Sequence, residues 1–478
     1  MSDFHESAEL GVLVLSNSSQ WMAEEHVYPI FRVPSPLRSI APDLFTPQVL
    51  ALGPLHSPAW NPKTPHSSLS IYTEMDHYKL LSWQKIFKED MPEQEAPFLH
   101  FLHQHKDPML ASYGGRLEKE YDSPALENHF VNRLALDACF IAALLHSLFQ
   151  GNFPHLKEKM AMEEIIMASR VSTTAHFFPI YSRTFSRPVQ KAILQDLLLV
   201  ENQVPLIAVK QAVKIESKCR SDEEAERVLE LYIAALAHRV LPFSRSRRIV
   251  LFSVMHASSG AHHLMDMMYS IVCMRTGPSA ESVQHKNMHM SQDLHVRDMP
   301  GAIRIHMSGV KFHGHWGSLN ELSFSNGRLS LPKIHVSDDT ERYFRNLIAY
   351  ESCFKTDRLD IVSYLHFMDF LIDTPADVDL LVESKIVTEA IGSNAKVAEM
   401  WNSLCRNTMC VFSPNYKAVA DSMQSYSKSP WRMMWAEFYR SKLSRPWLVA
   451  SILSASALLI MTFLILWYTI RLYHHEAS

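Results

Sequence analysis

A stretch near the C-terminus without any charged residue most constrains how this chain can fold. It comprises the 24 residues 447–470. As a helix it would be about 36 Å long, and the hydrocarbon core of a bilayer is about 30 Å thick. Trp447 begins the stretch, and Trp467 and Tyr468 lie near its other end, as aromatic residues do at membrane interfaces. A buried helix of a soluble domain is the alternative, but such helices rarely run this far without a charge. We therefore predict one transmembrane helix from Trp447 to Ile470.

Basic residues lie mainly on one side of this stretch, and this asymmetry predicts its orientation. Arg471 follows it closely, whereas five basic residues precede it: Lys428, Arg432, Arg440, Lys442 and Arg445. The positive-inside rule then places the body in the cytoplasm and the tail 471–478 on the other side. The plasma membrane and the endoplasmic reticulum are not distinguished. Residues 425–446, which mix aromatic and basic side chains, form either a juxtamembrane segment on the membrane surface or a plain helical linker.

Composition and charge limit the classes of partner. The formal net charge of −4, with no zinc-finger or aromatic RNA-binding pattern, predicts that the chain does not bind nucleic acid. The six cysteines are scattered and form no CxxC pair, which indicates a reducing compartment. Small residues four positions apart in the membrane stretch, such as Ala450 and Ser454, would allow two copies to pack as a homodimer.

The rest of the chain has the composition of a globular protein and predicts a mainly α, single helical body over 21–424, after a flexible segment 1–20. Apolar residues recur at helical spacing over 127–149. Ser221-x-x-Glu224 has the form of a capping box, so we expect a helix to begin at Ser221. Further helices are predicted over 71–88, 340–353, 364–372, 377–382 and 397–404. Residues 195–210 are almost wholly apolar, with Pro205 as a kink or a stop. Short β-like pieces between glycines predict a small sheet near 303–336.

Two irregular segments stand out from this helical pattern. Residues 27–58 are rich in proline yet contain Phe31, Val33 and Leu37, so we expect a strap that is extended with turns, not helical, and packed on the helices. A free peptide for a proline-reading domain is the alternative. Residues 276–300 form a loop rich in His and Met, whose side chains suit copper or zinc. Its spacing matches no known ligand set, so we predict no metal and no cofactor.

No catalytic signature is present, neither a nucleophile elbow nor a phosphate loop, a dinucleotide fingerprint, a zinc-protease helix or a kinase motif. Asp369 and Asp373 lie four residues apart, as an acid–base pair would, but acidic surface residues have the same spacing. Polar residues embedded in apolar helices are more informative. The predicted polar cluster is Asp137, Glu201, Asn202, Arg345 and Glu351, with Gln203 and Asn346 beside them.

We expect Asp137, Glu201 and Glu351 to be buried, with Arg345 as the partner of one of them, because a buried charge is costly unless it is paired. The seven polar residues would then meet in one network that fixes the register of the helices. The alternative is a catalytic cluster, so we predict no catalytic residue with that possibility left open. A deep pocket lined by Asp137, Glu201 and Glu351 would favour an enzyme, and a solid core would favour a binding protein.

Several segments, in this order, resemble a plant family catalogued as domain of unknown function 247. They are VYPIFRVPSPLR (27–38), FTPQVLALGPLH (45–56), EMDHYK around Met75 to Lys79, LALDACFIAALL (134–145), DLLLVENQVPLIAV (196–209), SGVKF (308–312), RNLIAYESC (345–353), FMDFLID (367–373) and the terminal apolar stretch. The sequence departs from the family pattern at Asp76, where Glu is usual, and at Ala142-Ala143.

The resemblance implies a plant origin, a mostly helical body and a C-terminal membrane helix, and it supplies no catalytic residues. Some grass members of the family lie at self-incompatibility loci and are thought to be male determinants of pollen recognition. We therefore predict a membrane-tethered recognition or signalling module that acts by binding an unknown protein partner. Pollen self-incompatibility is one process that the resemblance allows. The alternative is an enzyme with an unrecognised site at the embedded polar cluster.

Overall fold

The computed structural model describes residues 28–56, 72–114, 123–156, 185–243, 260–273, 300–355, 359–388, 392–408, 412–427 and 446–476. All structural statements below refer to these residues. Three predicted segments lie largely or wholly outside them: the N-terminal residues 1–20, the His/Met-rich loop 276–300 except for its last residue, and the part 428–445 of the juxtamembrane segment.

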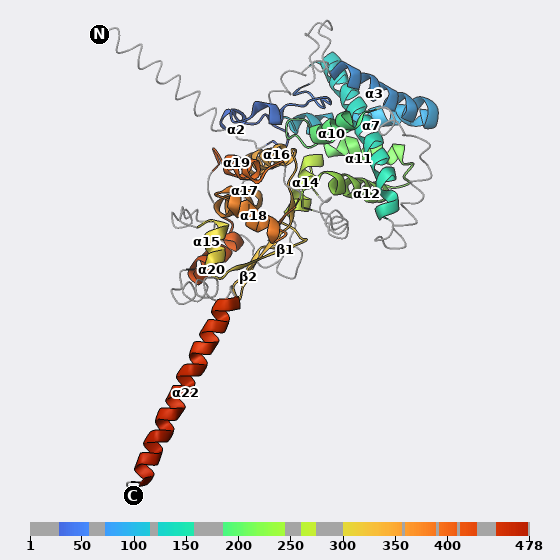
Figure 1. The fold of residues 1–478 in the computed structure, drawn as a ribbon. Helices are drawn as coiled ribbons and strands as arrows, with labels where there is room; N and C mark the ends of the chain where they lie inside the picture. Colours follow the sequence, from blue (N-terminus) through green and yellow to red (C-terminus); the bar gives the residue numbers. More distant parts are fainter. Residues whose placement is uncertain are drawn as a thin grey trace, which may run out of the picture.

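Helices packed around α7 (Pro124–Leu156) form the N-terminal half of the body (Figure 1). They are α3 (Tyr72–Gln84), α4 (Glu95–Gln104), α5 (Lys106–Ala111), α10 (Arg187–Asp196), α11 (Leu206–Glu216) and α12 (Asp222–Val240). The apolar residues of α7 recur every three or four positions, so side chains such as Phe130, Leu134 and Ile141 are buried against α3, α4, α11 and α12. The predicted helix over 127–149 is therefore confirmed.

A second group of helices forms the C-terminal half. It comprises α14 (Leu264–Val272), α15 (Ala302–Met307), α16 (Thr340–Cys353), α17 (Asp360–Leu371), α18 (Pro375–Glu383), α19 (Asn394–Leu404) and α20 (Pro414–Ser427). Phe344, Tyr364 and Trp401 meet where α16, α17 and α19 pack together, and all three are fully buried. The two halves share one continuous apolar core, so the described helices form a single body.

Five short strands complete the body and confirm the small β element. β1 (Lys311–His315), β3 (Arg328–Pro332) and β2 (Ser323–Ser325) form one sheet in that spatial order, with β1 parallel and β2 antiparallel to β3. Asn326 and Gly327 both have positive φ, as a two-residue hairpin turn requires. β4 (Ile334–His335) pairs instead with the distant β5 (Val387–Thr388).

Two local predictions need correction. The apolar segment 195–210 is interrupted over more residues than a kink or stop at Pro205 alone implies, because α10 ends at Asp196 and α11 begins only at Leu206. Between them, the Gln203 amide donates to the carbonyls of Leu197 and Leu199, and so takes the place of helical backbone hydrogen bonds. The strap was predicted to have turns but no helix. It contains α2 (Ser35–Arg38) and a 3-10 turn, Pro42–Phe45, in which proline occupies the first turn, where it is tolerated.

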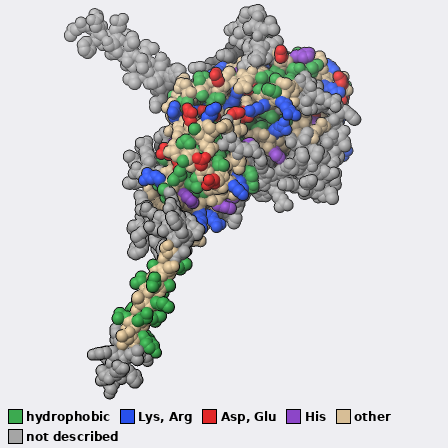
Figure 2. All heavy atoms as spheres, viewed as in Figure 1, with side chains coloured by type: hydrophobic (Ala, Val, Ile, Leu, Met, Phe, Trp, Pro, Cys, Tyr) green, Lys and Arg blue, Asp and Glu red, His purple; other side chains and the backbone are tan. Residues whose placement is uncertain are grey.

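The helix that follows the body, α22 (Pro446–Glu476), extends away from it as a single rod (Figure 1). Apolar side chains cover its visible face (Figure 2), and Leu459 and Phe463 are 72% and 69% exposed. Within α22, the residues Leu453–Thr469 form an apolar helix. This described part is shorter than a candidate membrane span. Among the described residues, only the Pro124–Gln150 part of α7 is long and apolar enough to cross a membrane, but 83% of its most apolar window is buried, as in a core helix.

Candidate functional site

The predicted polar residues gather mainly beneath the strap, residues 28–56 of the described chain. We call Lys79, Asp137, Asp196, Glu201 and Asn202 the polar clamp. All five are buried, with at most 1% of each residue exposed. They come from α3, α7, α10 and the loop between α10 and α11, and each contacts the backbone of the strap.

Asp137 of α7 forms an ion pair with Lys79 of α3, at 2.7 Å between Oδ1 and Nζ. The other carboxylate oxygen accepts the N–H of Gly53 at 2.8 Å, and Lys79 donates to the carbonyl of Ala51 at 2.6 Å. Both members of the ion pair therefore also hydrogen-bond to the strap, at Gly53 and Ala51. Such additional hydrogen bonds help a buried ion pair to offset the cost of its desolvation.

Gly53 is the point of closest approach between the strap and this ion pair. Its φ is +61°, and a Cβ atom there would lie 2.8 Å from the carbonyl oxygen of Gln203. The hydroxyl of Tyr113, which donates to that same carbonyl, would lie 2.9 Å from the Cβ. Only glycine fits this position without displacing its neighbours.

Asp196 and Asn202 hold the segment just before Gly53. The Asp196 carboxylate accepts the N–H groups of Gln48, Val49 and Leu50 at 2.8–2.9 Å. Asn202 accepts the N–H of Leu52 at 2.7 Å and donates to the carbonyl of Leu50 at 2.8 Å. Burial raises the pKa of the Asp196 carboxyl, and the three N–H donors oppose this shift. These side-chain hydrogen bonds take the place of the backbone hydrogen bonds that a neighbouring strand would form. An irregular segment can therefore be buried without leaving its backbone groups unpaired.

Glu201 holds the N-terminal part of the strap. It accepts the N–H of Val33 at 2.7 Å, contacts the guanidinium of Arg38, and lies 2.9 Å from Nε2 of His56. Burial alone would raise the pKa of this carboxyl, but the hydrogen bonds from His56, Val33 and Arg38 outweigh it and lower the pKa. All three partners belong to the strap, so Glu201 joins its two ends.

Glu351 and Arg345 do not join the polar clamp, so the predicted single network is wrong. Glu351 is buried elsewhere on α16, where it accepts the hydroxyl of Tyr269 at 2.7 Å and the N–H groups of Ile361 and Val362 at the start of α17. Burial raises its pKa to about 7.

Arg345 pairs with Glu341 at 2.7 Å on its own helix and reaches Ser403, not one of the three predicted carboxylates. Arg342, one turn earlier on α16, instead reaches the strap, where it contacts the carbonyl of Thr46 and lies 3.4 Å from Asp196. Asn346 also faces the strap and donates to the carbonyl of Leu44 at 2.9 Å. The helix turns Arg345 toward α19 and Arg342 toward the strap, which the sequence pattern did not reveal.

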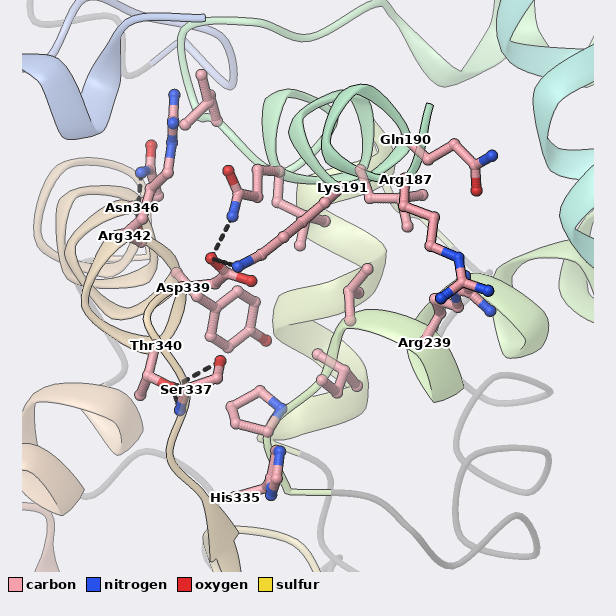
Figure 3. A pocket seen from close by; sticks show the side chains of 18 residues that line it. Arg187, Gln190, Lys191, Arg239, His335, Ser337, Asp339, Thr340, Arg342 and Asn346 are labelled. Atoms are coloured by element: carbon pink, nitrogen blue, oxygen red, sulfur yellow. Dashed lines mark hydrogen bonds and ion pairs between the residues drawn. The ribbon is translucent and has the colours of Figure 1, made fainter. Parts of the chain in front are cut away.

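A cavity of about 400 Å³ lies beside the polar clamp, between α10, the end of α12 and the start of α16 (Figure 3). Its basic side chains are those of Arg187, Lys191, Arg239 and Arg342. Asp339 holds Lys191 at 2.8 Å. Asp137, Glu201 and Glu351 are not among the described residues that line it. These three carboxylates, on which the alternative of an enzyme site rested, are thus separated from the cavity and accept structural hydrogen bonds.

Comparison with known proteins identifies the family. The profile of DUF247, described as "Plant protein of unknown function", matches residues 30–461, from the strap into α22. This chain belongs to the DUF247 family. The chain is 22% identical to the UPF0481 protein At3g47200 of Arabidopsis thaliana, over 91% of this chain and 84% of that protein. It is 20% identical to the putative UPF0481 protein At3g02645 of Arabidopsis thaliana, over 92% of this chain and 89% of that protein. No solved structure matches it.

One further group in this DUF247 chain has the donor atoms of a metal site. His366 and Asp369 of α17 and Cys405 after α19 each offer one ligand atom, and these three atoms lie within 4.8 Å of one another. Nitrogen, oxygen and sulfur donors suit zinc, although structural zinc usually has four protein ligands. Asp373, the predicted companion of Asp369, is exposed; burial first and Asp373 second raise the pKa of Asp369 to about 6.

Lys79, Asp196 and Arg342 belong to the site but were not predicted from the sequence. A signal for Lys79 was present, because it lies four residues after the buried Met75 and seven before the buried Ile86, on the apolar face of its helix. Asp196 and Arg342 had no comparable signal, since charged residues at the end or start of a helix are ordinarily exposed.

Proposed function

We propose that this DUF247 chain is a membrane-tethered recognition protein, in which α22 holds the helical body at a membrane and the body binds another protein. The observation that carries this proposal is the exposure of α22. Its apolar side chains, such as Leu459 and Phe463, are largely exposed along a helix that leaves the body. An apolar surface of this size is unfavourable in water and favourable in lipid, at roughly 25 cal/mol for each Å² of apolar surface.

The arrangement of the carboxylates supports recognition over catalysis. A general acid or base must reach a substrate, but Asp137, Glu201 and Glu351 are buried and accept hydrogen bonds from the backbone. The described cavity is lined by none of them. The alternative of an enzyme at the embedded polar cluster therefore has no supporting geometry, and the polar clamp acts as a structural device.

The membrane part is tested by flotation of the full chain, synthesised in the presence of lipid vesicles, after an alkaline wash. We expect the wild-type chain to float with the vesicles. The variant Leu459→Glu/Phe463→Glu should remain in the soluble fraction, because each buried carboxylate is costly in the bilayer. The control is Leu80→Glu, at an apolar position of the body that is 47% exposed, and it should float. Retention of the double variant on the vesicles would contradict tethering by α22.

The recognition part is tested by site-specific photo-crosslinking of the full chain in plant membranes. Ile207 and Trp316, each 36% exposed on the body, are suitable positions for the reactive group. We expect one saturable adduct that excess unlabelled chain competes away. An absence of any such adduct from several surface positions would argue against a protein partner. Pollen and leaf membranes compared in parallel would test the narrower hypothesis of pollen self-incompatibility.

A further inference from the structure

We propose that the cavity between α10, α12 and α16 is a binding site for a small amphipathic anion, one that carries a sulfonate, phosphate or carboxylate group on an apolar body. This inference goes beyond the recognition of a protein partner and does not depend on the membrane tether. It rests on the charge, the shape and the apolar floor of the cavity.

The basic side chains of the cavity come from three helices, and one of them, Arg342 of α16, already contacts the carbonyl of Thr46 and lies 3.4 Å from Asp196. Arg187 and Lys191 lie on α10, and Arg239 lies near the end of α12. In Figure 3 the side chains of Arg187 and Arg239 reach the same end of the cavity. Neither arginine forms an ion pair with any described residue. Cations that line one cavity without a carboxylate partner repel each other, and a bound anion would reduce this repulsion.

Asp339 is the only acidic residue among the described residues that line the cavity, and it is already engaged. It lies 2.8 Å from Lys191 and accepts from the amide of Gln195. Lys191 is neutralised by Asp339, and Arg342 is directed toward Asp196. Arg187 and Arg239 are therefore the cations that face a ligand. Guanidinium groups bind the oxygens of sulfonate, phosphate and carboxylate through paired hydrogen bonds, so these groups are the expected anions.

The floor of the cavity is apolar, which excludes a bare inorganic ion as the best ligand. Leu194, Leu198 and Leu241 line it and are each less than 9% exposed. A volume of about 400 Å³ is that of a drug-sized ligand site, larger than a phosphate or sulfate ion needs. A ligand that places an aromatic or aliphatic body against these leucines and an anionic group at the arginines matches both parts of the cavity.

Tyr343 adds a hydrogen-bond donor to the lining. It is 6% exposed, and its hydroxyl has no hydrogen-bond partner among the described residues. Burial raises the pKa of this hydroxyl well above 10, so it remains an O–H donor. A buried hydroxyl without an acceptor is destabilising, and a ligand oxygen would satisfy it.

The test is isothermal titration of the full chain, in mild detergent, with two probes of matched shape. Naphthalene-1-sulfonate carries the anionic group, and naphthalene-1-sulfonamide has the same ring system without the charge. We expect the sulfonate to bind one site per chain, about tenfold or more tighter than the sulfonamide. The reason is that the arginines attract the charged sulfonate group and gain little from the neutral sulfonamide. Equal affinity for the two probes, or no saturable binding of the sulfonate, would overturn the proposal.

Variants then assign the binding to this cavity. Arg187→Gln/Arg239→Gln should weaken sulfonate binding about a hundredfold, roughly tenfold for each arginine, and should leave sulfonamide binding unchanged. Both residues are exposed, so we expect this variant to fold, and each single variant provides an independent check. The matched control is Arg227→Gln, an exposed arginine at the other end of α12, and it should bind as the wild type does.

Tyr343→Phe keeps the ring and removes only the hydroxyl, and should weaken binding of the sulfonate about threefold to tenfold, as the loss of one hydrogen bond does. Sulfonate binding that is insensitive to the Arg187→Gln/Arg239→Gln exchange would place the site elsewhere and refute the proposal. Because none of these variants alters α22, loss of anion binding and loss of membrane tethering are separate outcomes.

Discussion

Lys79 and Asp137 form an ion pair inside the protein, with 2.7 Å between Nζ and Oδ1 and only 2% of each side chain exposed. The pair joins α3 to α7, and its two members also hold the strap at Ala51 and Gly53. The two charged side chains therefore connect three parts of the chain: α3, α7 and the strap. In such a pair, the loss of one partner is expected to cost more than the loss of both.

Replacement of Asp137 by leucine should lower the free energy of unfolding by about 3 kcal/mol, because the buried Lys79 would lose its nearer counter-charge and keep only Asp76, at 3.3 Å. Denaturant unfolding of the full chain in mild detergent measures the change. The double variant Asp137→Leu/Lys79→Met should cost less than the sum of the two single variants. Strict additivity would show that the pair does not act as a unit.

Gly53→Ala should destabilise the protein through close contact as well as through its backbone conformation. The added Cβ would lie 2.8 Å from the carbonyl oxygen of Gln203. Gly260→Ala is the matched control, since Gly260 also has positive φ, +83°, but has no atom within 4 Å of the added Cβ. We expect the free energy of unfolding to fall by about 1–3 kcal/mol more in the Gly53 variant than in the control, which is the usual cost of overpacking. Equal losses in denaturant unfolding would mean that backbone strain alone matters.

His263 should make the protein less stable in mild acid. Its Nδ1 accepts the N–H of Asp266 and its Nε2–H donates to the carbonyl of Pro29 in the strap. Burial lowers its pKa to about 4; Asp266 and the Pro29 carbonyl oppose this shift, and His262 and Lys355 add to it. In the unfolded chain the imidazole of His263 binds a proton near pH 6.5. Its contribution to the free energy of unfolding is therefore complete above that pH and is lost as the pH falls toward 4.

The expected loss from His263 at pH 5 is about 2 kcal/mol relative to pH 7. His263→Asn is the control, because asparagine can still cap the N–H of Asp266 but does not titrate. Chemical unfolding of both proteins at the two pH values gives the difference that belongs to this residue. If the wild type and the variant lose the same free energy between pH 7 and pH 5, another group causes the acid sensitivity.

The strap should become accessible to trypsin when the polar clamp is weakened. Asp196→Ala removes the acceptor for three consecutive N–H groups of the strap, and cleavage after Arg32 and Arg38 should then accelerate about tenfold or more. Asp222→Ala, at a largely exposed carboxylate on α12, is the control and should leave the cleavage rate unchanged. Rapid native cleavage at these arginines in the wild-type chain would count against a packed strap.

Protease added to sealed vesicles should digest the body and leave α22 protected. This outcome follows from the five basic residues between Lys428 and Arg445, which favour the cytoplasmic side for the body. Mass spectrometry of the protected fragment identifies it. A protected body with a glycan at Asn17, the asparagine of an Asn-Ser-Ser sequon, would show the reverse orientation.

Features decided within one helix or turn were predictable from the sequence. The apolar spacing over 127–149 marked the central helix α7, and the side chain of Ser221 caps α12 by accepting the N–H of Glu224 at 3.2 Å. The packing of the strap was also foreseeable, because an apolar segment that cannot form a helix must be covered by other elements. Its side chains at Val33 and Leu50 are buried accordingly.

The partners of the polar residues were decided only by the tertiary structure. Arg342 and Arg345 lie three positions apart on α16, yet one reaches the strap, 296 residues away at Thr46, and the other reaches Ser403 on α19. Charge and spacing alone do not distinguish the two arginines. A buried charge is satisfied by whichever donor or acceptor the docking of distant elements brings within about 3 Å, and that docking is determined by the packing of the whole apolar core.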